Sequence, residues 1–89
     1  MGLDLVELVM ELETAFDVEL PERSLVQVNT VGELYQVVAE RLYGTVPPAA
    51  PPTTDPAWPK LVSIIAASLG VPRERVTWEA TLTGDLGAN

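Results

Sequence analysis

The feature that most constrains this chain is a proline-rich segment in its middle. Residues 44–59, with the sequence GTVPPAAPPTTDPAWP, hold six of the eight prolines of the 89-residue chain. Because proline lacks a backbone amide donor, such a run favours an extended polyproline spacer over a helix or a central strand. The segment therefore predicts a linker between two blocks. Since neither block reaches the size at which domains usually fold alone, we expect the two to share one core.

The first block begins with an amphipathic helix. Apolar residues recur three and four positions apart over residues 3–16, which places them on one face of a helix. We expect this face to be buried, and its members are Leu5, Leu8, Val9, Leu12 and Phe16.

The opposite side of this helix carries more apolar surface than a single core contact requires. A second apolar stripe is formed by Leu3, Val6 and Met10. Beside it lies an acidic stripe formed by Asp4, Glu7 and Glu11. A run of charges on a helix is usually no more than a solvated face, but an adjoining apolar stripe favours a docking surface for a basic partner.

A second long helix is predicted from Val31 to Tyr43. Thr30 followed by Glu33 forms a capping box, in which each side chain satisfies an amide at the helix start, and Gly44 is placed to end the helix. The periodic apolar positions are Val31, Leu34, Tyr35, Val38 and Leu42.

After the linker the helical period returns and ends at Gly70. Pro59 is tolerated in a first turn, and the periodic positions are Trp58, Leu61, Val62, Ile65 and Leu69. A short turn is expected after Pro21, presenting Leu25, Val26 and Val28, and another near residues 72–76 in an otherwise irregular stretch that runs to residue 89. No strand is predicted, so the fold class is an all-α helical bundle.

Composition excludes several classes of function. The net charge is −8, the opposite of what a nucleic-acid binder requires. The chain has no cysteine and no histidine, which removes thiol nucleophiles, zinc–thiolate sites and the commonest general base, so we predict neither an enzyme nor a metal site. With no recognisable signal peptide and no uncharged run that could span a bilayer, the expected location is cytoplasmic and away from membranes.

Several separate motifs resemble the acyl carrier protein family. The last block, ending in Asp85-Leu86-Gly87, is similar to that family's first helix and following loop. The first block is similar to its second, third and fourth helices. The matching positions there are Leu3-Asp4, Glu7-Leu8, Phe16, Pro21 and Thr30-Val31-Gly32.

The resemblance implies that the halves stand in exchanged order. Reading from Asn89 on to Leu3 restores the family pattern, Asp-Leu-Gly, any residue, Asp or Asn, then Ser and Leu, with Gly2 at the place of the serine. The chain resembles a circular permutation, with its helices in the order II, III, IV, linker and I. It equally resembles a stretch excised between two tandem carrier domains. The expected organisation is one domain, with segments 1–43, 44–59 and 60–89.

In the resembled family the serine bears a 4′-phosphopantetheine arm, whose thiol holds the acyl chain. Because Gly2 has no hydroxyl, we expect no such arm on this chain. The resemblance implies that the attachment motif comprises Gly2, Leu3, Asp4, Asp85, Leu86, Gly87 and Asn89. Asp85 and Asn89 have a second reading, in which they satisfy local backbone amides, and the two readings are compatible.

The resemblance also implies partners and a lipid pocket. The partners are a phosphopantetheinyl transferase and basic acyl-processing enzymes of fatty acid or polyketide synthesis, which would contact Leu3, Asp4, Val6, Glu7, Met10 and Glu11. Residues that belong either to the core or to an acyl pocket are Leu8, Leu12, Phe16, Val28, Val38 and Ile65. Core is favoured for each of them, and Trp58 and Trp78 are expected to be packing residues.

The sequence is compatible with two other functions and with two forms of association. A peptidyl carrier domain of a nonribosomal peptide synthetase shares the implied fold, and a non-carrying acidic interaction domain would need no arm at all. The linker is long enough to return across its own domain or to reach a second molecule. A closed monomer and a domain-swapped dimer are therefore both compatible with the sequence.

Overall fold

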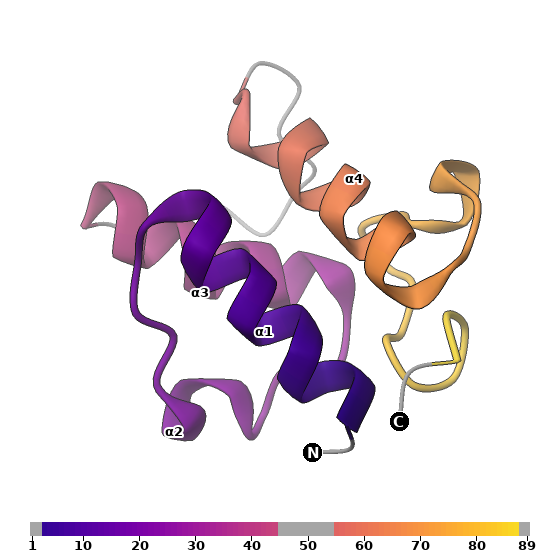
Figure 1. Cartoon of the computed structure of the whole chain (residues 1–89), viewed down its shortest axis with the longest axis horizontal. Helices are drawn as coiled ribbons and strands as arrows, with labels where there is room; N and C mark the ends of the chain where they lie inside the picture. The colour runs from indigo at the N-terminus through magenta and orange to yellow at the C-terminus, as the bar shows by residue number, and fades with distance from the viewer. Residues whose placement is uncertain (1–2, 45–54, 88–89) are drawn as a thin grey trace.

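The computed structural model describes residues 3–44 and 55–87. Within these two segments the chain forms four α-helices, a single 3-10 turn and no strand longer than an isolated bridge. The elements are α1 (Leu3–Phe16), α2 (Glu22–Leu25), α3 (Val31–Tyr43), α4 (Ala57–Leu69) and η1 (Arg73–Arg75) (Figure 1). The predicted all-α class is thereby confirmed for the described residues. The linker residues 45–54, Gly2 and Asn89 lie outside them.

The boundaries of α3 follow from its caps. The side chain of Thr30 accepts a hydrogen bond from the Glu33 amide at 3.2 Å, and Glu33 Oε1 accepts one from the Thr30 amide at 3.0 Å. At the other end, Gly44 adopts a φ of 78°, and its amide donates to the Glu40 carbonyl. The left-handed conformation that closes a helix in this way strongly favours glycine. The capping box and the glycine stop are thus both confirmed.

The start of α4 lies inside the segment that the prolines assign to the linker. The helix begins at Ala57, with Pro56 as its N-cap residue and Pro59 inside the first turn, as predicted. The first turn of a helix has free amides in any case, so a proline there removes no hydrogen bond. The helical period, which includes Trp58, therefore marks the start of α4 better than the position of the last proline does.

Lys60 joins α4 to the end of α1. Its Nζ donates to the Ala15 carbonyl at 2.7 Å and lies 4.9 Å from the centre of the Phe16 ring. The last turn of α1 has no basic residue of its own. A cation supplied from α4 thus satisfies a free carbonyl at the negative end of the α1 dipole.

The buried core draws on both described segments. Fully buried large side chains come from α1, α3 and α4, and they are Leu8, Leu12, Val31, Leu34, Val38, Leu61 and Ile65. Leu82 and Leu86 belong to the same cluster. They lie in residues 76–87, which follow η1 and are called the C-terminal loop below. The expected sharing of one core is therefore observed, whereas the division of the whole chain into one domain of three segments stays a prediction.

The C-terminal segment also completes the start of α3. The amides of Val31 and Gly32 donate to the carbonyls of Ala80 and Trp78, each at 2.9 Å, and the Leu82 amide donates to the Asn29 carbonyl at 2.9 Å. A helix leaves its first amides without partners in its own backbone. Here residues 78 and 80 supply those partners from the far end of the chain.

Three aromatic rings pack together beside this contact. The rings of Tyr35, Trp58 and Trp78 lie with their centres 5.6–5.7 Å apart. Each ring comes from a different element, namely α3, α4 and the C-terminal loop. The packing role expected for the two tryptophans is confirmed.

Asp55 forms a polar clasp beside residues 45–54, the part of the predicted linker that is called the linker from here on. Its carboxylate accepts hydrogen bonds from the hydroxyl of Tyr35, from the hydroxyl of Tyr43 at 2.8 Å and from the Ala57 amide at 2.9 Å. Partial burial acts to raise the pKa of Asp55, but the three hydrogen bonds outweigh it and hold that pKa below its usual value. The residues on either side of the linker are thereby fixed next to each other.

Candidate functional site

The loop that bears the predicted attachment motif is held by a reciprocal pair of hydrogen bonds. The Thr81 amide donates to the Asp85 carboxylate, and the Asp85 amide donates to the Thr81 hydroxyl, both at 2.9 Å. Leu86 is buried, and Gly87 adopts a φ of 74°. The structure thus shows the local role of Asp85, in which the carboxylate satisfies a backbone amide; this role is compatible with a place in the attachment motif.

The charge state of Asp85 follows from these contacts. Hydrogen bonds from the Thr81 amide and hydroxyl, together with the nearby Arg75 guanidinium, hold the pKa of Asp85 below its usual value. Arg75 also donates to the Asp85 carbonyl at 3.3 Å. The loop therefore keeps an ionised carboxylate at its surface.

This loop and the beginning of α1 lie at the same end of the molecule (Figure 1). Leu5 in the first turns of α1 and Leu82 in the loop line one cavity, which establishes that the two are close. The structure therefore brings the C-terminal loop close to α1 at Leu5 and Leu82, although the two elements lie at opposite ends of the sequence. Gly2 and Asn89 are outside the described residues, as are the side chains of Leu3 and Asp4.

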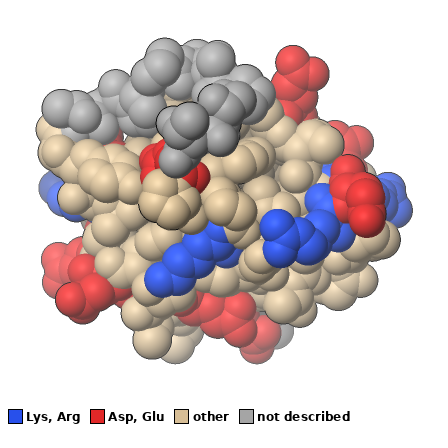
Figure 2. All heavy atoms as spheres, turned by 90° about the horizontal axis from the view of Figure 1, so that it is seen from above, with Lys and Arg blue, Asp and Glu red and all other residues tan. Residues whose placement is uncertain are grey.

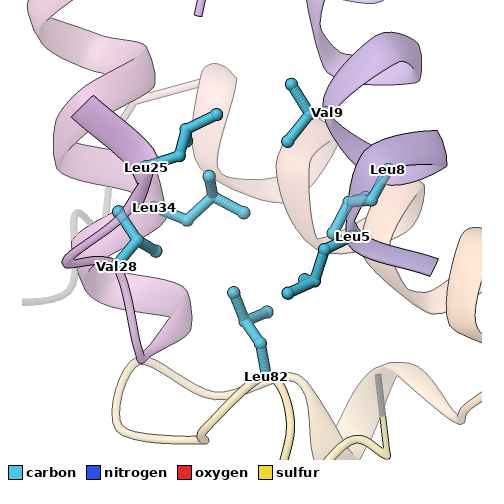
Figure 3. Close-up of a pocket in the computed structure, with 7 residues that line it drawn as sticks. All are labelled: Leu5, Leu8, Val9, Leu25, Val28, Leu34 and Leu82. Atoms are coloured by element: carbon cyan, nitrogen blue, oxygen red, sulfur yellow. The ribbon is translucent and has the colours of Figure 1, made fainter. Parts of the chain in front are cut away.

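The cavity is small and almost entirely apolar. Its volume is about 20 Å³, which is on the order of the space for one water molecule. It lies between α1, the α2–α3 region and the C-terminal loop (Figure 3), and its lining residues are Leu5, Leu8, Val9, Leu25, Val28, Leu34 and Leu82. An alkyl chain would fit only if these side chains moved apart.

The predicted pocket residues divide between this cavity and the core. Leu8 and Val28 line the cavity, whereas Leu12, Val38 and Ile65 are fully buried in the core and Phe16 packs against it. Sequence reasoning missed five of the lining residues. The helical period of the first block already contained Leu5 and Val9, but no pattern marked Leu82, because its loop has no period.

The outer face of α1 is exposed as predicted. Val6 and Met10 are exposed by 39% and 60%, which is high for apolar residues on a helix. Glu7 and Glu11 are exposed beside them. The four side chains form a mixed apolar and acidic surface, called the α1 surface below.

Positive charge lies mainly elsewhere on the molecule. Seen from the side of α4, basic side chains form a band across the face, and acidic side chains lie mostly toward its margins (Figure 2). Three of the five basic residues, Lys60, Arg73 and Arg75, belong to α4 and η1. The α1 surface has no lysine or arginine within its helix, so its negative charge is not neutralised along α1.

Other kinds of site find no support in the described part of the chain. Residues 3–44 and 55–87 contain no group of three or more acidic side chains placed to hold a metal ion. None of the described helices is long and apolar enough to cross a bilayer.

The described residues thus form a helical domain with a small apolar cavity and an exposed acidic surface on α1. Residues 3–38 match the family described as "Phosphopantetheine attachment site". This family is a carrier domain rather than an enzyme. The match covers α1, α2 and most of α3.

Comparison with curated proteins points the same way. The chain is 47% identical over 39 residues to an acyl carrier protein of Syntrophobacter fumaroxidans, which covers 44% of this chain and 48% of that protein. It is 40% identical over 41 residues to an acyl carrier protein of Amoebophilus asiaticus, covering 46% and 51%. The chain thus spans about half the length of the curated relatives it matches. No solved structure matches it. Together these matches support an acyl carrier protein domain.

Proposed function

We propose that the chain is an acyl carrier domain of fatty acid or polyketide synthesis whose two halves stand in exchanged order. The observation that supports the proposal is that Leu5 of α1 and Leu82, three residues before the Asp85-Leu86-Gly87 motif, line the same cavity. In the family pattern this motif and the start of α1 are consecutive in sequence. Here they occupy opposite ends of the chain, but the described residues next to them lie at the same end of the molecule (Figure 1).

The attachment position does not fit the phosphopantetheine arm. Arm transfer needs a hydroxyl oxygen to form the phosphodiester, and Gly2 offers none. The proposal is therefore that this chain has the fold and surfaces of a carrier without carrying an arm. A serine before α1 would lie next to a helix N-terminus, where the dipole and free amides favour a phosphate group.

Gly2→Ser is expected to restore arm transfer. The purified variant, incubated with coenzyme A and a phosphopantetheinyl transferase, should gain the mass of one arm, and the unchanged chain should gain none. The measurement is intact-protein mass spectrometry. The phosphodiester forms between the new hydroxyl and the arm, and the nucleotide part of coenzyme A leaves.

If Gly2→Ser is not modified, either the recognition sequence is missing or the assignment to the carrier class is wrong. A second variant distinguishes these two causes. It adds Asp-Leu-Gly-Ala-Asn before the new serine, so that the family motif is continuous on one side of the modification point. Circular dichroism verifies that both variants are helical. If neither folded variant is modified, the carrier assignment is wrong.

The α1 surface is proposed to dock basic acyl-processing enzymes, with Val6 and Met10 packing and the two glutamates attracting positive charge. The double substitution Glu7→Lys and Glu11→Lys should weaken binding to such an enzyme by roughly tenfold at low salt and much less at high salt. Titration at two ionic strengths measures this effect.

A matched control keeps the change of net charge but moves it off α1. Glu74→Lys with Glu79→Lys alters two exposed glutamates in the η1 region and should leave the affinity nearly unchanged. Equal weakening by both pairs would mean that overall charge, and not the α1 surface, governs binding.

The apolar cavity is proposed to be the starting point of an acyl pocket. Leu25 and Val28 come from the short α2 and the turn after it, and their displacement would enlarge the space behind them. A non-carrying interaction domain would keep the α1 surface and fail the arm-transfer test.

A further inference from the structure

The two described segments meet through non-covalent contacts. Residues 3–44 and 55–87 share one buried cluster, and three backbone hydrogen bonds link Asn29, Val31 and Gly32 to residues 78–82. None of these contacts requires that both segments belong to the same molecule. Within the described residues they are non-covalent, because the chain has no cysteine.

The linker begins and ends at one place on the surface. The Tyr43 hydroxyl lies 2.8 Å from the Asp55 carboxylate, so the residues that flank the linker are held together. Ten residues lie between Gly44 and Asp55, and fully extended they reach on the order of 30 Å. The longest dimension of the molecule is 29 Å. The linker is therefore longer than closure needs and long enough to reach a second molecule.

We propose that a second copy of this chain is a partner for the interface between the two segments, through reciprocal exchange of residues 55–87. In the exchanged dimer, α4 and the C-terminal loop of each copy dock on α1 and α3 of the other. The buried contacts and the Asp55 clasp are the same in both forms. This proposal does not rest on the carrier function.

Concentration and unfolding decide between the two forms. The closed monomer needs no association and is favoured in dilute solution. Exchange requires the core to open, since Leu61 and Ile65 of α4 are fully buried against the other segment. Dimers are therefore expected after refolding at high protein concentration, and they should return slowly to monomers after dilution.

The structure offers a specific probe of exchange. Thr30 and Thr81 face each other in an antiparallel bridge, between the hydrogen bonds Val31 to Ala80 and Leu82 to Asn29. Residues paired in this way have closely spaced Cα atoms, a geometry suited to a disulfide. Thr30→Cys in one copy and Thr81→Cys in another are held in this bridge geometry only when one copy supplies residues 55–87 to the other.

Equal amounts of the two single-cysteine chains are unfolded, refolded together at high concentration and oxidised mildly. Non-reducing electrophoresis should then show a covalent heterodimer several-fold above the level from chains mixed without unfolding. The control pairs Thr30→Cys with Ala67→Cys, an exposed position on α4, and should stay at that lower level. Equal yields from the two pairings would overturn the proposal.

A second measurement uses the unchanged sequence, because Thr30→Cys weakens the capping box. Isotopically light and heavy chains are refolded together, and native mass spectrometry should show dimers of mixed composition. Monomers alone at every concentration would also overturn the proposal. Asp55→Asn should speed the return of these dimers to monomers by on the order of tenfold, because it removes charged hydrogen bonds across the interface that must open.

Discussion

Leu61→Ala is expected to destabilise the fold by about 2–5 kcal/mol. Leu61 is fully buried on α4, so the substitution removes packed methyl groups and leaves a cavity that the neighbouring helices fill only in part. A domain of this size is stable by only about 4–13 kcal/mol. Urea unfolding followed by circular dichroism should show a lower midpoint with an unchanged slope.

Leu69 provides a matched control on the same helix. It packs against the core at the end of α4 but is only partly buried. Leu69→Ala removes the same atoms from a less enclosed position and should have a clearly smaller effect. Similar losses at both positions would mean that α4 is not anchored through the Leu61 side of the helix.

Gly32→Val is expected to cost about 2–3 kcal/mol, at the upper end of the usual range for overpacking. A Cβ atom on Gly32 would lie 2.5–2.8 Å from three atoms of the Trp78 indole ring. The ring cannot easily move aside, because it packs against Tyr35 and Trp58. Thermal or urea unfolding measures the loss.

A double-mutant cycle tests the cause of this effect. In a Trp78→Ala background the steric conflict is absent, so Gly32→Val should cost far less than in the unchanged chain. If the two substitutions are additive, the effect of the valine comes from the helix backbone and not from the indole ring.

The three long helices were predictable because their information is local. For α3, the capping box and Gly44 gave both ends as the structure shows them, and the apolar period of α1 gave its buried and exposed faces. The start of α4 was harder, because proline disfavours helix interiors but is tolerated in a first turn. Residues 57–59 satisfy both patterns, because they belong to the proline-rich segment and also form a first helical turn in which proline is tolerated.

The candidate site depended more on long-range contacts. The exposed α1 surface followed from helix geometry, and the attachment motif followed from family resemblance. The partners of Asp85 and the place of Leu82 were out of reach, since residues 81–87 are fixed by hydrogen bonds to each other and by packing against α1 and α3. A residue that is ordered by tertiary contacts leaves no periodic trace in its own sequence.

The Asp55 clasp also could not be foreseen, although its members were visible. Tyr35 was assigned to the core from its spacing, and it is buried. Its hydroxyl nevertheless reaches a carboxylate twenty positions later. Burial and the contact with Asp55 together raise the pKa of Tyr35. Periodicity predicts which face of a helix a residue occupies, but not which polar group its hydroxyl contacts.

The hydrogen bonds from Val31 and Gly32 to residues 80 and 78 have a consequence for how the molecule opens. Amides in the first turn of a helix normally exchange with solvent quickly, because nothing in the helix itself protects them. In this chain the same two amides are covered by a segment that is nearly fifty positions distant. Their protection from hydrogen exchange therefore measures how often the C-terminal segment undocks. A helix end is ordinarily the first part to fray, but here its amides report on cooperative opening of the fold.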